Sequence, residues 1–198
     1  MLDRLYDRLD GHDRQAGSDL KQLETELWRQ YGRKGSVLVL DMSGTSKTTR
    51  ESGLVPLLLR IRRMQRLTAP LVDEHGGSVV KFEADNLFAF FAHVKQALAC
   101  AIAIQTELAR YNTGREPQWR IEACIGIAQG RAIVVPEHDF FGDCVNVAAR
   151  LGEDLAKPGE ILVATAAVAR LSPGHGFRVQ SIQVEDGDIS TPTTRIIY

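Results

Sequence analysis

The sequence predicts an α+β protein in which helices pack on a mixed or antiparallel sheet. Short β-branched runs alternate with amphipathic helical patterns, two of the runs flank a turn as a hairpin, and no internal repeat or low-complexity tract interrupts this order. The chain has 198 residues, 44% of them hydrophobic, which is enough for about one domain with an ordinary core.

The charge balance argues against general adhesion to polyanions. The formal net charge is -1, from 24 basic and 25 acidic residues, so no basic surplus attracts nucleic acid or an anionic membrane. No run approaches the roughly eighteen apolar residues of a membrane span, and the charged start differs from an apolar signal peptide. We expect a cytosolic (cytoplasmic) chain that binds a specific ligand, with no nucleic-acid partner and no direct membrane insertion.

The cysteines predict neither a disulfide framework nor a zinc site. Cys100, Cys124 and Cys144 are odd in number, widely separated and without CxxC spacing. We expect them to be buried or partly buried free thiols.

Residues 1–34 predict a helical segment ahead of the main domain, residues 35–198. Its sparse leucines are divided by the breaker "GHDRQAGSD", which indicates two short helices, the second capped by Ser18 or Asp19. We interpret 1–34 as a dimerising or transducing segment.

The next elements are a buried strand and a long helix. "SVLVLDMSG" is a short apolar run that closes on Asp41 and a glycine turn, which is typical of a buried strand with a carboxylate at its end. From Leu54 apolar residues recur at helical spacing until "HGG". The apolar set is Leu57, Leu58, Ile61, Met64, Leu67 and Leu71. The interleaved arginines, expected on the solvated face, are Arg60, Arg62, Arg63 and Arg66.

The remaining elements continue the alternation. "SVVKF" and "LFAFF" flank "EADN" as a hairpin, and residues 93–112 predict a second amphipathic helix. "QWRIEACIGIA" and "RAIVV" predict two more strands, "GDCVNVAARLGEDLA" a helix, and "GEILVA" a strand.

Two strand ends are candidates for a metal site. Asp41 and Asp85 each end an apolar strand, and two carboxylates beside a turn suit Mg²⁺ or Mn²⁺. Either aspartate alone is more often a turn former or a helix cap. Ser43, Gly44 and Thr45 follow Asp41 with amides that could face a phosphate, although the stretch lacks P-loop spacing.

A third candidate is the helix predicted from Gly142. Asn146 and Arg150 lie four residues apart on one face, while apolar residues supply packing on the other. The alternative interpretation is a surface polar pair in which Arg150 bridges to an acidic neighbour.

Together these stretches resemble the catalytic domain of the class III nucleotidyl cyclases, the adenylate and guanylate cyclase homology domain, from about Val37 to Leu171. "VLVLDMSGTS" is similar to the first metal motif, "EHGGSVVKFEADNLFAFF" to the second, "FFGDCVNVAARL" to the transition-state helix and "AKPGEILV" to the strand after it. The resemblance implies a ferredoxin-like, palm-type antiparallel sheet with packed helices, and makes residues 35–198 the cyclase homology domain.

The resemblance also implies the cofactors and the reaction. Asp41 and Asp85 would hold two divalent cations, Mg²⁺ or Mn²⁺, with the Met42 carbonyl as a further ligand. The ribose 3′-hydroxyl would attack the α-phosphorus of ATP in line, giving 3′,5′-cyclic AMP and pyrophosphate.

Further roles follow from the same resemblance. Asn146 would orient the ribose, and Arg150 would stabilise charge on the α-phosphate. Lys81 and Asp139 fall on the base-reading positions, where lysine can donate to adenine N1 and aspartate can accept from the 6-amino group. Ser43, Gly44 and Thr45 complete the expected substrate site.

The family arrangement implies a homodimer with composite sites, because one protomer gives the metal aspartates and its partner gives the other groups. Two alternatives stay open: a guanylate cyclase, and a degenerate cyclase-homology module that binds nucleotide or partners without turnover. Glu83 and Ala84 replace the usual isoleucine-glycine pair, and Glu83 is either an extra ligand or an outward-facing charge. The C-terminal stretch lacks the lysine-glycine motif that usually clamps the terminal phosphates in this family, and Lys47 and Arg195 are candidates to replace that lysine.

Overall fold

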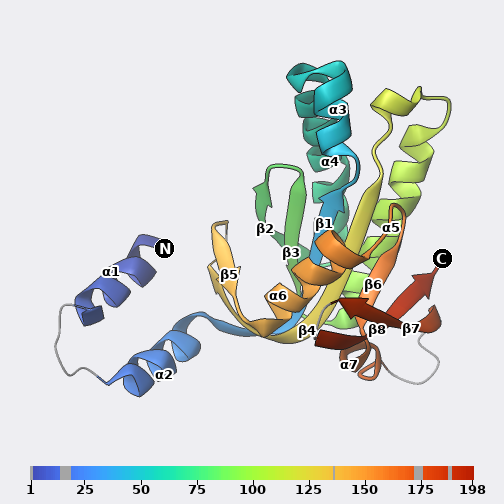
Figure 1. Cartoon of the computed structure of the whole chain (residues 1–198). Helices are drawn as coiled ribbons and strands as arrows, with labels where there is room; N and C mark the ends of the chain where they lie inside the picture. The colour runs from blue at the N-terminus through green and yellow to red at the C-terminus, as the bar shows by residue number, and fades with distance from the viewer. Residues whose placement is uncertain (1, 14–18, 136, 172–175, 187–188) are drawn as a thin grey trace.

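The chain folds around one mixed sheet with helices on both of its faces (Figure 1). The computed structural model describes residues 2–13, 19–135, 137–171, 176–186 and 189–198. The strands are β1 (Gly32–Met42), β2 (Gly77–Glu83), β3 (Asn86–Phe91), β4 (Ala123–Val135), β5 (Asp139–Phe141), β6 (Ile161–Ala164), β7 (Arg178–Asp186) and β8 (Ile189–Ile197). The helices are α1 (Leu2–Asp13), α2 (Leu20–Tyr31), α3 (Thr45–Ser52), α4 (Leu54–Glu74), α5 (Val94–Asn112), the 3₁₀ turn η1 (Pro117–Trp119), α6 (Asp143–Ala149), the π-helical η2 (Arg150–Leu155) and α7 (Thr165–Val168).

The strand order is β2-β3-β1-β4-β6-β8-β7, and the short β5 pairs with β4 off this path. Each described pair of neighbouring strands is antiparallel except β4 with β6, which run parallel. The predicted α+β class with a mixed sheet is therefore confirmed. The single parallel pair is the departure from a purely antiparallel palm-type sheet.

β1 is buried on both faces, which explains its unbroken apolar run. Leu38 and Leu40 belong to a core shared with α4 and α5, while Val37 and Val39 belong to a second core shared with α6. All four side chains are 0% exposed. Because side chains alternate along a strand, Asp41 continues the row of Val37 and Val39 and faces the α6 side of the sheet.

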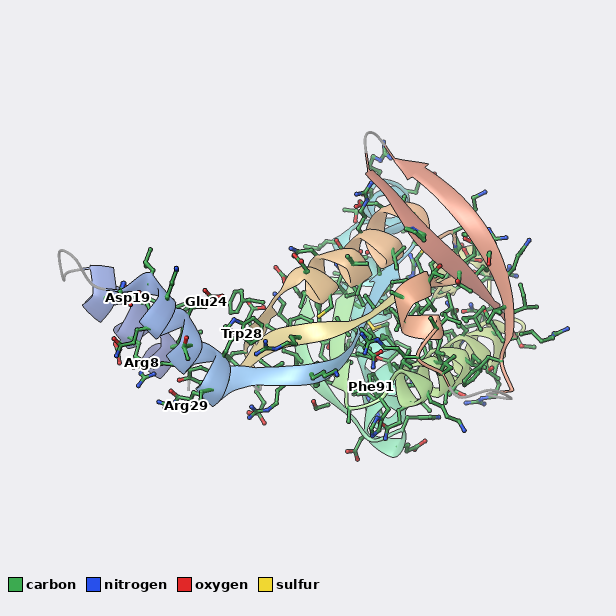
Figure 2. All side chains as sticks on the ribbon, turned by 90° about the horizontal axis from the view of Figure 1, so that it is seen from below. Arg8, Asp19, Glu24, Trp28, Arg29 and Phe91 are labelled. Carbon is green, nitrogen blue, oxygen red and sulfur yellow. The ribbon has the colours of Figure 1, made fainter. Side chains whose placement is uncertain are left out.

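The first two helices form a pair that projects from the sheet, as Figures 1 and 2 show. A small third core joins Leu5, Leu27 and Tyr31 to Val135 at the end of β4. Trp28 adds a second contact, since its ring lies 4.4 Å from the Arg131 guanidinium. The helix pair therefore rests on the C-terminal half of β4. None of the described helices is long and apolar enough to cross a lipid bilayer.

Most predicted element boundaries are confirmed. Asp19 caps α2 by accepting a hydrogen bond from an amide two residues on, while Ser18 lies outside the described residues. α4 begins at Leu54 and ends before "HGG", α5 lies within the predicted 93–112, and "EADN" forms the β2–β3 turn. The three cysteines are free and buried, as expected.

One predicted pair of strands is wrong. "QWRIEACIGIA" and "RAIVV" do not form two strands: a single strand, β4, begins at Ala123 in the first stretch, runs unbroken through the second and pairs with β1 along the whole of β1. Gly130, which lies between the two stretches, allows a close approach to α6, because a Cβ there would lie 2.8 Å from the Cys144 Cβ. The residues "QW" belong to η1 and not to a strand.

The face of α4 was also predicted incorrectly at two positions. Arg60 is only 6% exposed and lies on a buried stripe with Met64, Thr68 and Val72, whereas Leu58 is 52% exposed. The stripe is thus rotated by about one residue from the predicted one. Arg60 reaches the end of β1, where its guanidinium lies 3.5 Å from the Ser43 carbonyl oxygen.

Candidate active site

Asp41 stands at the end of the central strand, between two neighbours in the same row. Asn86 on β3 and Cys124 on β4 are its register partners on either side. Burial, followed by repulsion from the nearby carboxylates of Asp85, Glu153 and Asp154, raises the pKa of Asp41 to about 7. The strand end is therefore a partly desolvated group of carboxylates, which a bound cation would stabilise.

Asp85 lies in the turn between β2 and β3, one residue before the partner of Asp41. The turn requires a left-handed backbone at Ala84, whose φ is 49°. Such a conformation is costly for a residue with a Cβ and is normally taken by glycine. Ala84, which replaces the glycine usual in the family, therefore has a strained backbone.

The oxygen atoms around these aspartates fit a hard divalent cation. The Oδ1 of Asn86 is buried and has no hydrogen-bond partner among the described residues, so an acceptor is left open beside Asp41 and Asp85. Met42 is buried, with 2% of the residue exposed, and its carbonyl is the only oxygen that it could offer to a hard cation. No group of three or more His, Cys, Asp or Glu suited to a metal occurs in the described part of the chain. Substrate oxygens or water would therefore have to complete the shell.

The turn after Asp41 leads directly into a helix that the sequence analysis did not predict. Gly44 has a φ of 73°, and α3 begins at Thr45. The Ser43 amide already donates to the Glu122 carbonyl, and the Ser43 Oγ lies 3.3 Å from the Cys124 Sγ. A cavity of about 350 Å³ opens beside this turn. Its lining includes Ser43, Gly44, Arg60, Arg120 and Glu122.

Lys81 and Asp139 meet across β2 and β5. The Lys81 Nζ lies 3.3 Å from the Asp139 Oδ1 and 2.6 Å from the Glu83 Oε2, and it stands 5.0 Å from the centre of the Phe88 ring. Burial acts to lower the pKa of Lys81, but hydrogen bonds with Glu83 and Asp139 outweigh it and leave this pKa above its usual value. The lysine is therefore a charged donor held between two carboxylates.

The Glu83 side chain is 63% exposed and pairs with Lys81. Of the two alternatives for Glu83, an extra metal ligand or an outward-facing charge, the structure shows the outward-facing charge. The Phe88 ring, which contacts Lys81, packs in turn against Phe140, with ring centres 5.9 Å apart in an edge-to-face arrangement.

Asn146 and Arg150 occupy one turn of the helix that follows Gly142. The Arg150 amide donates to the Asn146 carbonyl, so the two residues are stacked along one side. Asn146 is exposed and Arg150 is partly buried. Of the residues predicted to pack on the other side, Ala148 and Leu151 are buried, whereas Val145 and Val147 are only partly buried. Cys144 is buried there as well.

The helix changes from α to π geometry at Arg150. The Ala156 amide donates to the Leu151 carbonyl five residues earlier, which is the π pattern. Two glycines let this segment press against the sheet: a Cβ on Gly126 would lie 2.1 Å from the Ala148 oxygen and 2.4 Å from the Gly152 nitrogen. The position of Arg150 is therefore set by close backbone contact.

Glu153 and Asp154 were not identified from the sequence, although both lie near Asp41. The Asn86 Nδ2 donates to the Glu153 Oε1 at 3.1 Å, which joins the β2–β3 turn region to η2. Burial raises the pKa of Glu153, and the Asp154 carboxylate adds to this increase. The acidic pair directly after "AARLG" was the available signal.

The two candidates for a phosphate-clamping residue are placed differently. The Arg195 Nη2 lies 2.8 Å from the Glu160 Oε1, and its Nη1 donates to Gln180, so its guanidinium is bound within the C-terminal part of the sheet. The side chain of Lys47 lies outside the described residues.

Comparison with known proteins identifies relatives by sequence. The chain is 33% identical over 131 residues, 66% of its length, to a Rhizobium meliloti (strain 1021) protein assigned as adenylate cyclase 3, of which it spans 22%. It is 26% identical over 167 residues, 76% of its length, to the adenylate cyclase of Anabaena cylindrica, of which it spans 33%. The chain thus spans between about a fifth and a third of the length of these relatives. No protein-family model matches it.

Solved structures share the same fold. An adenylate/guanylate cyclase/hydrolase from Silicibacter pomeroyi aligns with a TM-score of 0.66 and 28% identity, over 84% of this chain and 98% of that one. The adenylyl cyclase CyaB from P. aeruginosa aligns with a TM-score of 0.70 and 18% identity, over 84% and 95% of the two chains.

Proposed function

We propose that this chain, which carries a class III adenylate/guanylate cyclase catalytic domain, converts ATP into 3′,5′-cyclic AMP and pyrophosphate. The observation that carries the choice of ATP is the pairing of Lys81 with Asp139 at 3.3 Å. A lysine donor beside an aspartate acceptor matches N1 and the 6-amino group of adenine, whereas guanine presents the reversed pattern. The names of the sequence relatives, which are adenylate cyclases, agree with this choice.

Asp41 and Asp85 are the residues we assign to two Mg²⁺ or Mn²⁺ ions, with the Met42 carbonyl as a further ligand. The burial of Asp41 and its repulsion by the Asp85 carboxylate, which raise the Asp41 pKa, support this assignment. Cations bound there supply positive charge to the triphosphate and lower the pKa of the ribose 3′-hydroxyl. Ser43, Gly44 and Thr45 would then line the phosphate site at the turn that opens α3, although the Ser43 amide itself is bonded to the Glu122 carbonyl.

Asn146 and Arg150 are assigned to the sugar and the α-phosphate. The Asn146 amide is exposed and free to orient the ribose. The planar guanidinium of Arg150 would stabilise the charge that builds on the α-phosphate oxygens during in-line attack. Close packing at Gly126 supports this role, because it limits movement of the helix relative to the sheet.

We further propose that the chain acts as a homodimer with composite sites, as the family resemblance implies. One protomer supplies Asp41 and Asp85, and its partner supplies the Lys81–Asp139 pair with Asn146 and Arg150. In this arrangement the helix pair of residues 1–34 is a dimerising or transducing segment ahead of the cyclase domain, residues 35–198. Its contacts with Val135 and Arg131 on β4, the strand that pairs with β5 and packs against α6, support this assignment.

A second candidate is a cyclase-homology module that binds nucleotide without turnover. Two observations favour it: the left-handed backbone of Ala84 beside Asp85, and the hold of Glu83 on Lys81. The full set of Asp41, Asp85, Asn146 and Arg150 favours catalysis, since a module without chemistry has no need of it.

The experiment that tests the proposal is incubation of the chain with ATP and Mn²⁺, followed by identification of the product. We expect cyclic AMP and pyrophosphate in equal amounts, and no product from the Asp41→Asn variant. A chain that binds ATP yet yields no cyclic AMP would support the module, and a preference for GTP would support the guanylate cyclase alternative.

A further inference from the structure

Asn86 is the neighbour of both metal-site aspartates. It follows Asp85 in the chain and is the direct register partner of Asp41 across β1 and β3. Side chains directly opposite each other on antiparallel strands share one face, with Cβ atoms about 5 Å apart. The Asn86 amide therefore lies beside the Asp41 carboxylate, on the side of the sheet that α6 and η2 cover.

The orientation of this amide is fixed by Glu153. The Asn86 Nδ2 donates to the Glu153 Oε1 at 3.1 Å. A carboxylate only accepts hydrogen bonds, so the NH₂ group must face Glu153 and the carbonyl oxygen must face the other way. Glu153 thus decides which end of Asn86 is directed toward the aspartates.

The Oδ1 atom of Asn86 is buried and unsatisfied. No described residue donates a hydrogen bond to it. An unpaired buried acceptor is costly, and such an atom usually has a bound water or ion as its partner. A neutral amide oxygen is a common ligand of hard cations, and unlike a third carboxylate it adds no charge repulsion to Asp41 and Asp85.

We propose that Asn86 contributes its Oδ1 to the cation site of Asp41 and Asp85, as a direct ligand or as the acceptor for a cation-bound water, and that Glu153 is the positioning residue that aims it. This inference rests on the cation site of the proposed function. It also gives Glu153 a role through geometry, because it ties that site to η2, the segment that begins at Arg150.

Direct binding of Mn²⁺ to the full chain, without nucleotide, tests the inference independently of catalysis. The electron paramagnetic resonance signal of free Mn²⁺ disappears on binding, so it reports the affinity. We expect Asn86→Ala and Glu153→Ala each to weaken Mn²⁺ binding about tenfold or more, the usual effect of losing a ligand or its orienting partner. Glu153→Gln should bind Mn²⁺ nearly as well as wild type, since its Oε1 can still accept from Asn86.

Asp154→Ala is the matched control for charge. It removes one negative charge from the same segment near Asp41 but no hydrogen bond to Asn86. If Glu153 acts only through its charge, Glu153→Gln, Glu153→Ala and Asp154→Ala will weaken binding to a similar degree, which overturns the positioning role. If Glu153 acts through Asn86, the double variant Asn86→Ala/Glu153→Ala will bind no more weakly than Asn86→Ala alone.

Thermal unfolding separates a cation role from a structural one. In EDTA, Asn86→Ala should melt close to the wild-type temperature, because the removal of an unsatisfied buried acceptor offsets the loss of the hydrogen bond to Glu153. With Mn²⁺ the wild type should gain stability and Asn86→Ala should lose most of that gain. A variant that is destabilised equally with and without Mn²⁺ contradicts the inference, as does one that binds Mn²⁺ like wild type. A wild-type chain that binds no Mn²⁺ overturns the cation site itself.

Discussion

Lys81 on β2 and Asp139 on β5 approach each other to 3.3 Å between Nζ and Oδ1. The same ammonium lies 2.6 Å from the Glu83 Oε2, so it is shared between two carboxylates. In the proposed function an adenine base must compete with Glu83 for this donor. We therefore expect the departure of the sequence from the family pattern at Glu83 to affect the binding of the base.

Glu83→Gln should lower the KM for ATP by about two- to fivefold, because an exposed ion pair is worth at most about 1 kcal/mol and its loss frees Lys81. The kcat should change little, since Glu83 is placed outside the reacting groups. Steady-state kinetics at fixed Mn²⁺ measure both constants. Glu107→Gln is the matched control, because it breaks a pair with Arg110 at 2.6 Å on α5. A KM that stays the same in Glu83→Gln contradicts the competition.

The raised pKa of Asp41 predicts how the stability of the metal-free chain depends on pH. The pKa moves from 3.8 to about 7 on folding, so between these values the folded state binds the proton and the unfolded state does not. The free energy of unfolding should therefore fall as the pH rises from about 4 to 7 and then level off.

Asp41→Asn removes this loss. At pH 8 in EDTA, we expect the variant to be more stable than wild type by roughly 1 to 2 kcal/mol, a figure reduced for solvent screening because Asp41 is only partly buried. Denaturant titrations at pH 5 and pH 8, which lie below and above the Asp41 pKa of about 7, measure the difference. An equal effect of the mutation at both pH values would show that the Asp41 carboxylate is not desolvated.

Ala84→Gly should stabilise the chain. The left-handed φ of 49° costs alanine about 1 kcal/mol or more, and part of the gain is offset by the greater freedom of glycine in the unfolded state. We expect a net increase of about 0.5 to 1 kcal/mol in the free energy of unfolding. Ala92→Gly, at an exposed bend without a positive φ, is the control and should destabilise. Destabilisation by Ala84→Gly as well would contradict the strain.

Gly126→Ala should displace the helix that carries Asn146 and Arg150. The added Cβ would meet the Ala148 oxygen at 2.1 Å and the Gly152 nitrogen at 2.4 Å, and backbone atoms cannot move aside cheaply. We expect a loss of about 1 to 3 kcal/mol in stability and of most cyclase activity. Gly11→Ala, where nothing lies within 4 Å, is the control and should leave activity unchanged. Full activity in Gly126→Ala would show that the helix position is not critical.

Much of the site could be predicted from local patterns. Asp41 ends an apolar run, "EADN" lies between two strand patterns, and Asn146 and Arg150 have helical spacing, so each was placed on the correct element. These signals are local: they depend on periodicity and on turn residues within about fifteen positions.

The remaining features depend on contacts between distant segments. Glu153 meets Asn86 only because Gly126 lets the π-helical segment approach the sheet, and no local pattern reports that approach. Arg60 was predicted on the solvated face because it is charged. Its position along the helix instead puts it on the buried stripe, beside Ser43.

Complementation between two inactive variants tests the central claim most directly, because it requires turnover, the metal aspartates and the helix residues of two chains at once. Asp41→Ala and Asn146→Ala should each be inactive alone. Mixed in equal amounts with free exchange of protomers, half of the dimers are mixed and each has one intact site of two, so about a quarter of the wild-type rate of cyclic AMP formation should return. Mixed dimers confirmed by native mass spectrometry that form no cyclic AMP would contradict the composite cyclase site.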